Sequence, residues 1–132
     1  MKLVIGGYSQ GKLEVVVKHY KEDEFEVFDE ILPDEKQLVE IKVKSKIVVI
    51  NHFHRWVRKQ MLQEKNPEAE IACYLEKYPK TIIISDEIGN GIVPIDAFER
   101  EYRERTGRIL VNLAEQAEEV VRVICGIGQK IK

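Results

Sequence analysis

The chain has 132 residues, of which 44% are hydrophobic and 33% are charged, a composition typical of one folded domain of ordinary size. Its net charge of -2 and pI near 6.0 argue against the basic surface that nucleic-acid binding favours. No apolar run approaches the roughly 20 residues of a membrane span, and the run 1–5 is too short for a signal peptide. We therefore expect a cytoplasmic protein with one domain over 1–132 and no nucleic-acid or membrane partner.

Two cysteines, Cys73 and Cys125, lie far apart and form no C-x-x-C pair. Cysteines without a partner are commonly buried, and they stay reduced in the cytoplasm. We expect both to be buried free thiols.

Apolar runs alternate with helix-like segments along the chain, which is the pattern of βαβ units on a parallel sheet. The expected strands are 3–5, 25–32, 47–50, 81–84 and 120–125, followed by a basic tail. The expected helices are 11–20, one from 35 capped by Asp34, 53–78 divided at Asn66-Pro67, and a long one capped by Asp96. The sequence predicts a three-layer α/β domain with a mostly parallel central sheet of about five strands.

A glycine-rich loop follows the first expected strand: Gly6-Gly7-Tyr8-Ser9-Gln10-Gly11-Lys12-Leu13, with the spacing G-x-x-x-x-G-K. Glycines let the backbone curl so that its N–H groups face phosphate oxygens, and the lysine supplies a positive charge. The N-terminus of the next helix would add to this attraction. We interpret 6–13 as a phosphate-binding loop; on spacing alone, the alternative is an ordinary strand-to-helix turn.

A second polar group, Asn51-His52-Phe53-His54-Arg55, follows the third expected strand. Ligands of parallel sheets bind at the carboxyl ends of the strands. His52 and His54 could contact phosphate, transfer protons or bind a metal. The alternative is that they are polar residues at the start of the next helix.

A third group, Asp86 and Glu87, precedes the glycine-bearing segment 89–94. These carboxylates could hold a metal through water or accept a hydrogen bond from a substrate hydroxyl. The alternative is a surface turn with solvated charges.

The segment 82–94 reads I-I-I-S-D-E-I-G-N-G-I-V-P. It resembles the signature of the bifunctional adenosylcobinamide kinase / adenosylcobinamide-phosphate guanylyltransferase family, an apolar strand followed by N-E-V-G-x-G-I-V-P. Arg103, Gly107 and Arg108 match the family's helix pattern, and 126–132 is similar to its ending. The loop 6–13 is similar to the family's G-G-x-x-S-G-K-S.

This resemblance implies a P-loop NTPase-like fold that binds GTP or ATP at residues 6–13. It also implies phosphorylation of adenosylcobinamide and GMP transfer through a guanylated histidine, in cobalamin biosynthesis, by a homo-oligomer. Lys12 would hold phosphates and Glu87 would position Mg²⁺ or the acceptor. His52 or His54 would replace the family's histidine.

The chain departs from the family pattern at several positions. Leu13 stands where a serine hydroxyl would hold Mg²⁺, and Asn51 stands where an acid would. The interval 13–46 is short and lacks the family's histidine motif, and Leu110-Val111 replaces its Asn-Gln. These departures imply weakened Mg²⁺ binding and reduced or lost transfer. The alternative function is a non-catalytic relative that binds a nucleotide or a corrinoid as a regulatory or interaction subunit.

Overall fold

The computed structural model describes residues 1–89, 91–92 and 95–132, and it contains one six-stranded sheet in the order β2-β3-β4-β1-β5-β6. The strands are β1 (Lys2–Gly6), β2 (Phe25–Asp29), β3 (Ile47–Asn51), β4 (Thr81–Asp86), β5 (Glu119–Ile124) and β6 (Ile127–Lys130). The helices are α1 (Lys12–Val17), α2 (Glu35–Lys44), α3 (Phe53–Leu62), α4 (Pro67–Lys77) and α5 (Ala97–Gln116). All neighbouring strands are parallel except β5 and β6. The predicted class, an α/β fold with a mostly parallel sheet, is confirmed.

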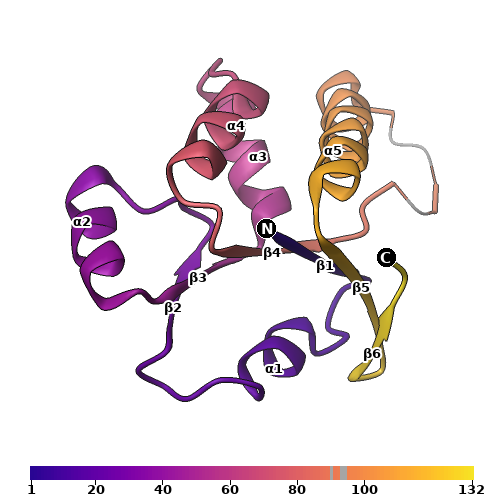
Figure 1. Ribbon diagram of the computed structural model, residues 1–132. Coiled ribbons are helices and arrows are strands. Elements are labelled where there is room, and N and C mark those ends of the chain that lie inside the picture. Colours follow the sequence, from indigo (N-terminus) through magenta and orange to yellow (C-terminus); the bar gives the residue numbers. More distant parts are fainter. Residues whose placement is uncertain (90, 93–94) are drawn as a thin grey trace.

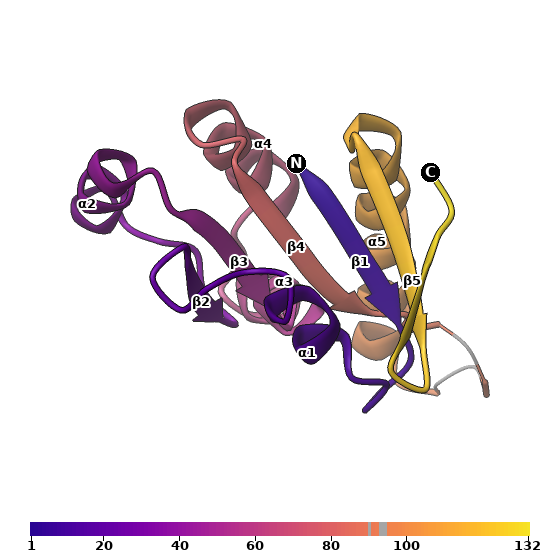
Figure 2. The ribbon, with the colours of Figure 1, turned by 60° about the horizontal axis from the view of Figure 1, so that its bottom comes forward.

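Helices cover both faces of the sheet, α2–α5 on one side and α1 on the other (Figures 1 and 2). Side chains alternate between the faces along each strand. In β1, Leu3 therefore packs in the core under α2–α5, whereas Val4 packs with Val16 of α1. Because both faces are covered, the central strands are almost continuously apolar, as the sequence indicated.

Side-chain caps set three helix starts, at the predicted caps Asp34 and Asp96 and at Asn66, which was predicted only as a point of division. Asp34 forms a capping box with Gln37, Asn66 accepts a hydrogen bond from the backbone of Ala69 with Pro67 following it, and Asp96 accepts one from Glu99. The division of 53–78 into two helices at Asn66-Pro67 is confirmed.

Helix α1 is shorter than expected. It ends at Val17 rather than Tyr20 and has only six residues. Its β-branched run Val15-Val16-Val17 disfavours helix, and turns occupy the next residues. A helix of this length adds little dipole to the loop before it.

The expected basic tail is a sixth strand instead. Cys125 and Gly126 both have positive φ, 50° and 75°. A two-residue turn of this kind suits a tight hairpin, and β6 pairs antiparallel with β5, Ile124 facing Ile127. The strand count of about five was therefore one too low.

The expectation that both cysteines are buried is wrong. Cys73 lies on the outer side of α4, beside the buried Ile71 and Tyr74, and Cys125 lies in the β5–β6 turn. Both are exposed and free.

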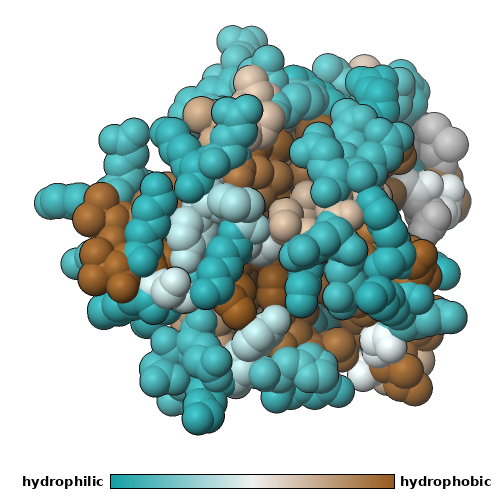
Figure 3. Space-filling model, in the orientation of Figure 1, coloured by the Kyte–Doolittle hydropathy of each residue, from teal (hydrophilic) through white to brown (hydrophobic). Residues whose placement is uncertain are grey.

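The face of the molecule in Figure 3 is largely hydrophilic, with a hydrophobic patch over α2. Helix α2 buries Leu38 and Ile41 against the sheet and leaves Val39 and Val43 exposed. No helix in the described part of the chain is long and apolar enough to cross a membrane.

Candidate functional site

The loop between β1 and α1 depends on its glycines. A Cβ atom at Gly6 would lie 2.6 Å from the carbonyl oxygen of Val123, closer than atoms can approach, so β1 can end beside β5 only with glycine there. Gly11 has a φ of 80°, which favours glycine, and Ser9 also has a positive φ of 53°. The chain therefore turns sharply before α1 starts.

The β5–β6 turn holds this loop in place. The side-chain oxygen of Gln10 accepts a hydrogen bond from the backbone N–H of Cys125 at 2.7 Å. The backbone carbonyl of Gln10 accepts one from the backbone N–H of Gly126 at 2.8 Å. The backbone N–H groups from Tyr8 to Gly11 donate to no residue that the structure describes. Polar backbone groups need partners, so these four donors are available to an anion.

Lys12 points inward from the start of α1. The residue is only 7% exposed, and its ammonium donates to the carbonyl of Gly7 at 2.7 Å. The same nitrogen lies 2.6 Å from Oδ1 of Asp86, at the end of the neighbouring strand β4. The lysine charge is therefore fixed beside the loop rather than placed in bulk water.

The ring of His54 contacts both the backbone and the carboxylate of Asp86. Its Nδ1 accepts a hydrogen bond from the Asp86 backbone at 3.1 Å, and its Nε2 lies 3.4 Å from Oδ2 of Asp86. This network assigns the ring proton to Nε2. The hydroxyl of Tyr102 in α5 donates to the His54 carbonyl at 2.8 Å and fixes the residue further.

Burial lowers the pKa of His54 to about 4. The carboxylate of Asp86 acts in the opposite direction, while His52, Arg55 and Lys12 lower the pKa further. The imidazole is therefore neutral near pH 7, and it contacts Asp86 as a hydrogen-bond partner rather than as a cation.

His52 and Asn51 face a different carboxylate. Nδ1 of His52 lies 2.6 Å from Oδ1 of Asp29, and Nδ2 of Asn51 donates to the same oxygen at 3.1 Å. Asp29, Glu30 and His52 each have an atom that could bind a metal ion, and these three atoms lie within 4.8 Å of one another. Glu30 also forms ion pairs with Arg55 and Lys59. The two histidines thus lie in separate contacts, with ring centroids 5.9 Å apart.

Glu87 points away from Lys12. Its two carboxylate oxygens bind Arg122 of β5 at 2.9 and 3.0 Å, and its backbone N–H donates to the Gly6 carbonyl. Successive side chains in an extended chain point to opposite sides, so Asp86 and Glu87 cannot both reach the lysine. Sequence reasoning named Asp86 among the candidates, but only the structure distinguishes it from Glu87 as the partner of Lys12.

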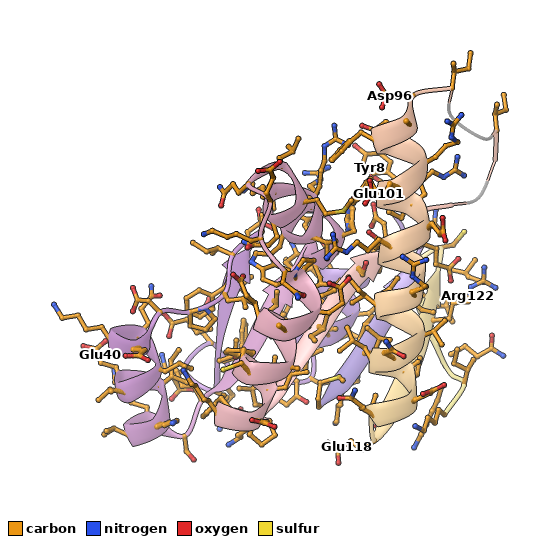
Figure 4. All side chains as sticks on the ribbon, turned by 90° about the horizontal axis from the view of Figure 1, so that it is seen from above. Tyr8, Glu40, Asp96, Glu101, Glu118 and Arg122 are labelled. Carbon is orange, nitrogen blue, oxygen red and sulfur yellow. The ribbon has the colours of Figure 1, made fainter. Side chains whose placement is uncertain are left out.

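A pocket of about 410 Å³ lies at this end of the sheet, a volume suited to a small ligand. It is lined by Tyr8, Ser9, Gln10, Gly11, Lys12, Leu13, Glu14, Asn51, His52, Arg55 and Asp86. Figure 4 shows Tyr8 at the end where Asp96 starts α5, and Glu118 at the opposite end. Most of the predicted loop residues, 8–13, thus line one pocket together with His52. His54 does not line this pocket but contacts Asp86, which does.

A second hollow of about 470 Å³ lies beside α1 and β6. Its lining includes Val4, Val16, Ile82 and Val121, with Lys2 and Glu119 among its polar members. It contains none of the predicted site residues.

The oxygen atoms of the first pocket suit a Mg²⁺ ion, which prefers carboxylate and carbonyl ligands. Asp86 and Glu14 offer carboxylates and Ser9 a hydroxyl, whereas Leu13 offers no ligand atom. A metal held here would use Asp86 or Glu14 rather than the residue after the lysine.

A mostly parallel sheet with a glycine-lysine loop between its first strand and first helix defines a P-loop NTPase-like domain. Residues 14–131 match the model of the family described as "Cobinamide kinase / cobinamide phosphate guanyltransferase", and the chain belongs to this family. The matched range starts after Lys12, so the phosphate-binding interpretation of the loop depends on its own sequence and geometry.

Three curated relatives agree with this assignment. The "Bifunctional adenosylcobalamin biosynthesis protein CobU" of Escherichia coli is 38% identical over 79 residues, which is 58% of this chain and 44% of the relative. Its namesake from Salmonella typhimurium is 43% identical over 53 residues, 40% of this chain and 29% of the relative. The CobP protein of the same description from Pseudomonas aeruginosa is 31% identical over 65 residues, 49% of this chain and 38% of the relative. Each match thus spans less than half of the relative's length.

Proposed function

We propose that this chain binds the phosphates of GTP or ATP at residues 6–13, as a nucleotide-binding protein of the adenosylcobinamide kinase and guanylyltransferase type linked to cobalamin biosynthesis. The observation that carries this proposal is the buried ammonium of Lys12, which lies in the pocket beside four backbone N–H groups without partners among the described residues. Backbone N–H donors without partners, next to one fixed cation, are the chemistry that binds phosphate.

The predicted site residues have separate roles in this proposal. Lys12 and the loop amides hold the phosphates, and Arg55 at the rim supplies a second cation. His52 faces the pocket and is the histidine placed to transfer a proton or to take up GMP, whereas His54 is buried and positions Asp86. Glu87, paired with Arg122, would act on an acceptor only after leaving that pair.

We further propose that phosphoryl or guanylyl transfer is reduced. Leu13 brings a hydrocarbon side chain to the pocket where a hydroxyl would serve a metal ion. Asn51 hydrogen-bonds Asp29 and carries no negative charge. Both substitutions weaken the positioning of a metal-bound phosphate, on which phosphoryl transfer depends almost entirely.

The alternative is a non-catalytic relative that binds a nucleotide or a corrinoid and acts as a regulatory or interaction subunit. The specific observation in its favour is again Leu13, because the substitution removes a ligand and leaves the anion-binding donors intact.

Equilibrium binding of GTP and ATP to the purified protein tests the proposal. We expect binding that Lys12→Ala weakens at least tenfold or so, since a charged hydrogen bond contributes roughly 1.5–3 kcal/mol. Lys2→Ala, at the opposite end of β1, is the matched control and should not change binding. Equal binding by wild type and Lys12→Ala would contradict the proposal.

Turnover separates the two functions. Conversion of adenosylcobinamide with ATP or GTP identifies an enzyme, and its absence despite nucleotide binding identifies a binding subunit. A phosphoramidate-linked GMP adduct that His52→Ala abolishes would identify the histidine of guanylyl transfer.

We propose a homo-oligomer, because β6 leaves a strand edge with the exposed Ile127 at the border of the sheet. Light scattering after size exclusion measures the oligomer directly. Two exposed free thiols suit a reducing compartment, and we propose the cytoplasm.

A further inference from the structure

We propose that Asp86 is an internal, exchangeable counter-ion of Lys12, and that the nucleotide takes its place and brings a divalent cation that Asp86 then holds. This inference rests on the nucleotide binding proposed above and goes beyond it: it names the form of the ligand and the carboxylate that receives the metal.

A bound phosphate and Asp86 would compete for the ammonium of Lys12. Its ammonium already has two oxygen partners, the Gly7 carbonyl and Asp86 Oδ1, at 2.7 and 2.6 Å. An ammonium has three donors in all. One donor therefore remains free, but the charge-assisted position is occupied by Asp86. A phosphate that takes this position displaces the carboxylate, and its net affinity for Lys12 is the difference between the two contacts.

Loss of Lys12 as its counter-ion would be unfavourable for the Asp86 carboxylate. Its side chain is only 13% exposed, so the carboxylate cannot lose its cation and become well hydrated. The other contact that the structure describes for its carboxylate is with Nε2 of His54, whose ring is arranged as a neutral partner because its Nδ1 accepts a hydrogen bond from the Asp86 backbone. A buried charge without a counter-charge is strongly unfavourable, so the exchange needs a new cation at Asp86.

The charged residues that line the pocket balance one another. Lys12 and Arg55 are its basic residues, and Glu14 and Asp86 are its acidic ones. These formal charges cancel. A nucleoside triphosphate would therefore meet no net positive charge, and a divalent cation that enters with it supplies the missing attraction.

Asp86 is also the pocket residue best suited to hold a divalent cation. Leu13 has no oxygen, and the Asn51 amide already donates to Asp29. Asp86 is held at the end of β4 by His54 and pairs in register with Gly6, directly beside the loop. It is thus the positioned carboxylate of the pocket, while Glu14 is exposed on α1. His54 is then a positioning residue that acts through Asp86.

Asp86→Asn tests this inference, with a non-hydrolysable GTP analogue as the probe and its dissociation constant measured in EDTA and in saturating Mg²⁺. For wild type we expect Mg²⁺ to tighten binding about tenfold or more. In Asp86→Asn we expect tighter binding than wild type in EDTA, because the internal competitor is lost, and no further gain from Mg²⁺. Glu119→Gln removes the carboxylate beside Lys2 at the opposite end of β1 and should leave both constants at the wild-type value.

The outcomes separate this inference from the proposed function. Wild-type binding that is equally tight with and without Mg²⁺ overturns the inference and leaves nucleotide binding intact. A variant that loses affinity equally in both media shows a structural role for Asp86 and also overturns it. No binding by wild type in either medium overturns both. Asp86→Glu keeps the charge and should keep the Mg²⁺ gain; if neither variant folds, the wild-type comparison alone decides.

Discussion

Lys12 and Asp86 form a buried ion pair that joins the start of α1 to the end of β4, with 2.6 Å between Nζ and Oδ1 and side chains only 8% and 13% exposed. Each charge is shielded from water by the fold and compensated by the other. Such a pair contributes little net stability, but its two members depend on each other.

Removing one partner should therefore be worse than removing both. We expect Lys12→Met to lower the free energy of unfolding by about 3 kcal/mol, because it leaves the Asp86 carboxylate buried and unpaired. Adding Asp86→Asn to the same protein should restore much of the loss. Urea unfolding of wild type, both single variants and the double variant measures the coupling as a double-mutant cycle. Additive effects of the two substitutions would contradict the pairing.

Gly6 and Gly107 should respond in opposite directions to alanine. At Gly6 the new methyl group would meet the Val123 carbonyl at 2.6 Å, so we expect a loss of at least about 2 kcal/mol in unfolding free energy. Gly107 lies inside α5 with no atom within 4 Å of its added Cβ, and alanine favours helix there by about 0.5–1 kcal/mol. Thermal unfolding of both variants checks the signs, and a neutral Gly6→Ala would show that β1 and β5 are not so closely paired.

Much of this fold could be predicted from local signals. The apolar runs of β3 and β4 and the caps Asp34, Asn66 and Asp96 each act within a few residues, so the sequence carries them directly. The same reasoning placed the turn of 6–13 between a strand and a helix. The class of fold follows from these elements, because alternating strands and helices leave few other arrangements.

The features that were missed depend on contacts distant in sequence. Strand β6 has a weak apolar pattern, and it forms because the Cys125-Gly126 turn returns the chain along β5. The choice between Asp86 and Glu87 depends on where β4 ends beside β1, with Arg122 of β5 on the other side. The positive φ of Cys125 cannot be inferred from its residue type. Gly126, the second residue of the turn, is nevertheless a residue that two-residue hairpin turns favour.

Glu68 and Arg105 should make stability depend on pH at the α4–α5 contact. Their bidentate pair, with 2.6 and 2.8 Å between nitrogen and oxygen atoms, lowers the pKa of Glu68 below its ordinary 4.5. A lowered folded-state pKa contributes stability above the unfolded value, and this is lost as the pH falls through the folded one. Because the Glu68 side chain is 40% exposed, we expect only about 0.5 kcal/mol.

Urea unfolding of wild type and Glu68→Gln measures this contribution. The two proteins should differ at neutral pH and converge as the pH falls below the lowered pKa of Glu68, where the wild-type carboxylate is protonated too. Glu104→Gln is a suitable control, since its pair with Arg108 lies within one helix and is largely exposed. A difference that persists unchanged in acid would assign the effect to packing rather than charge.

Cys73 and Cys125 should both react with a thiol reagent in the folded protein, because both are exposed. Only Cys125 lies near the loop: its backbone donates to the Gln10 side chain at 2.7 Å. A nucleotide that orders the loop should therefore slow labelling of Cys125 and leave Cys73, on α4, as an internal control. The variants Cys73→Ser and Cys125→Ser assign each rate. Equal slowing of both thiols would indicate a global change, and no slowing of Cys125 under saturating nucleotide would show that the ligand does not order this turn.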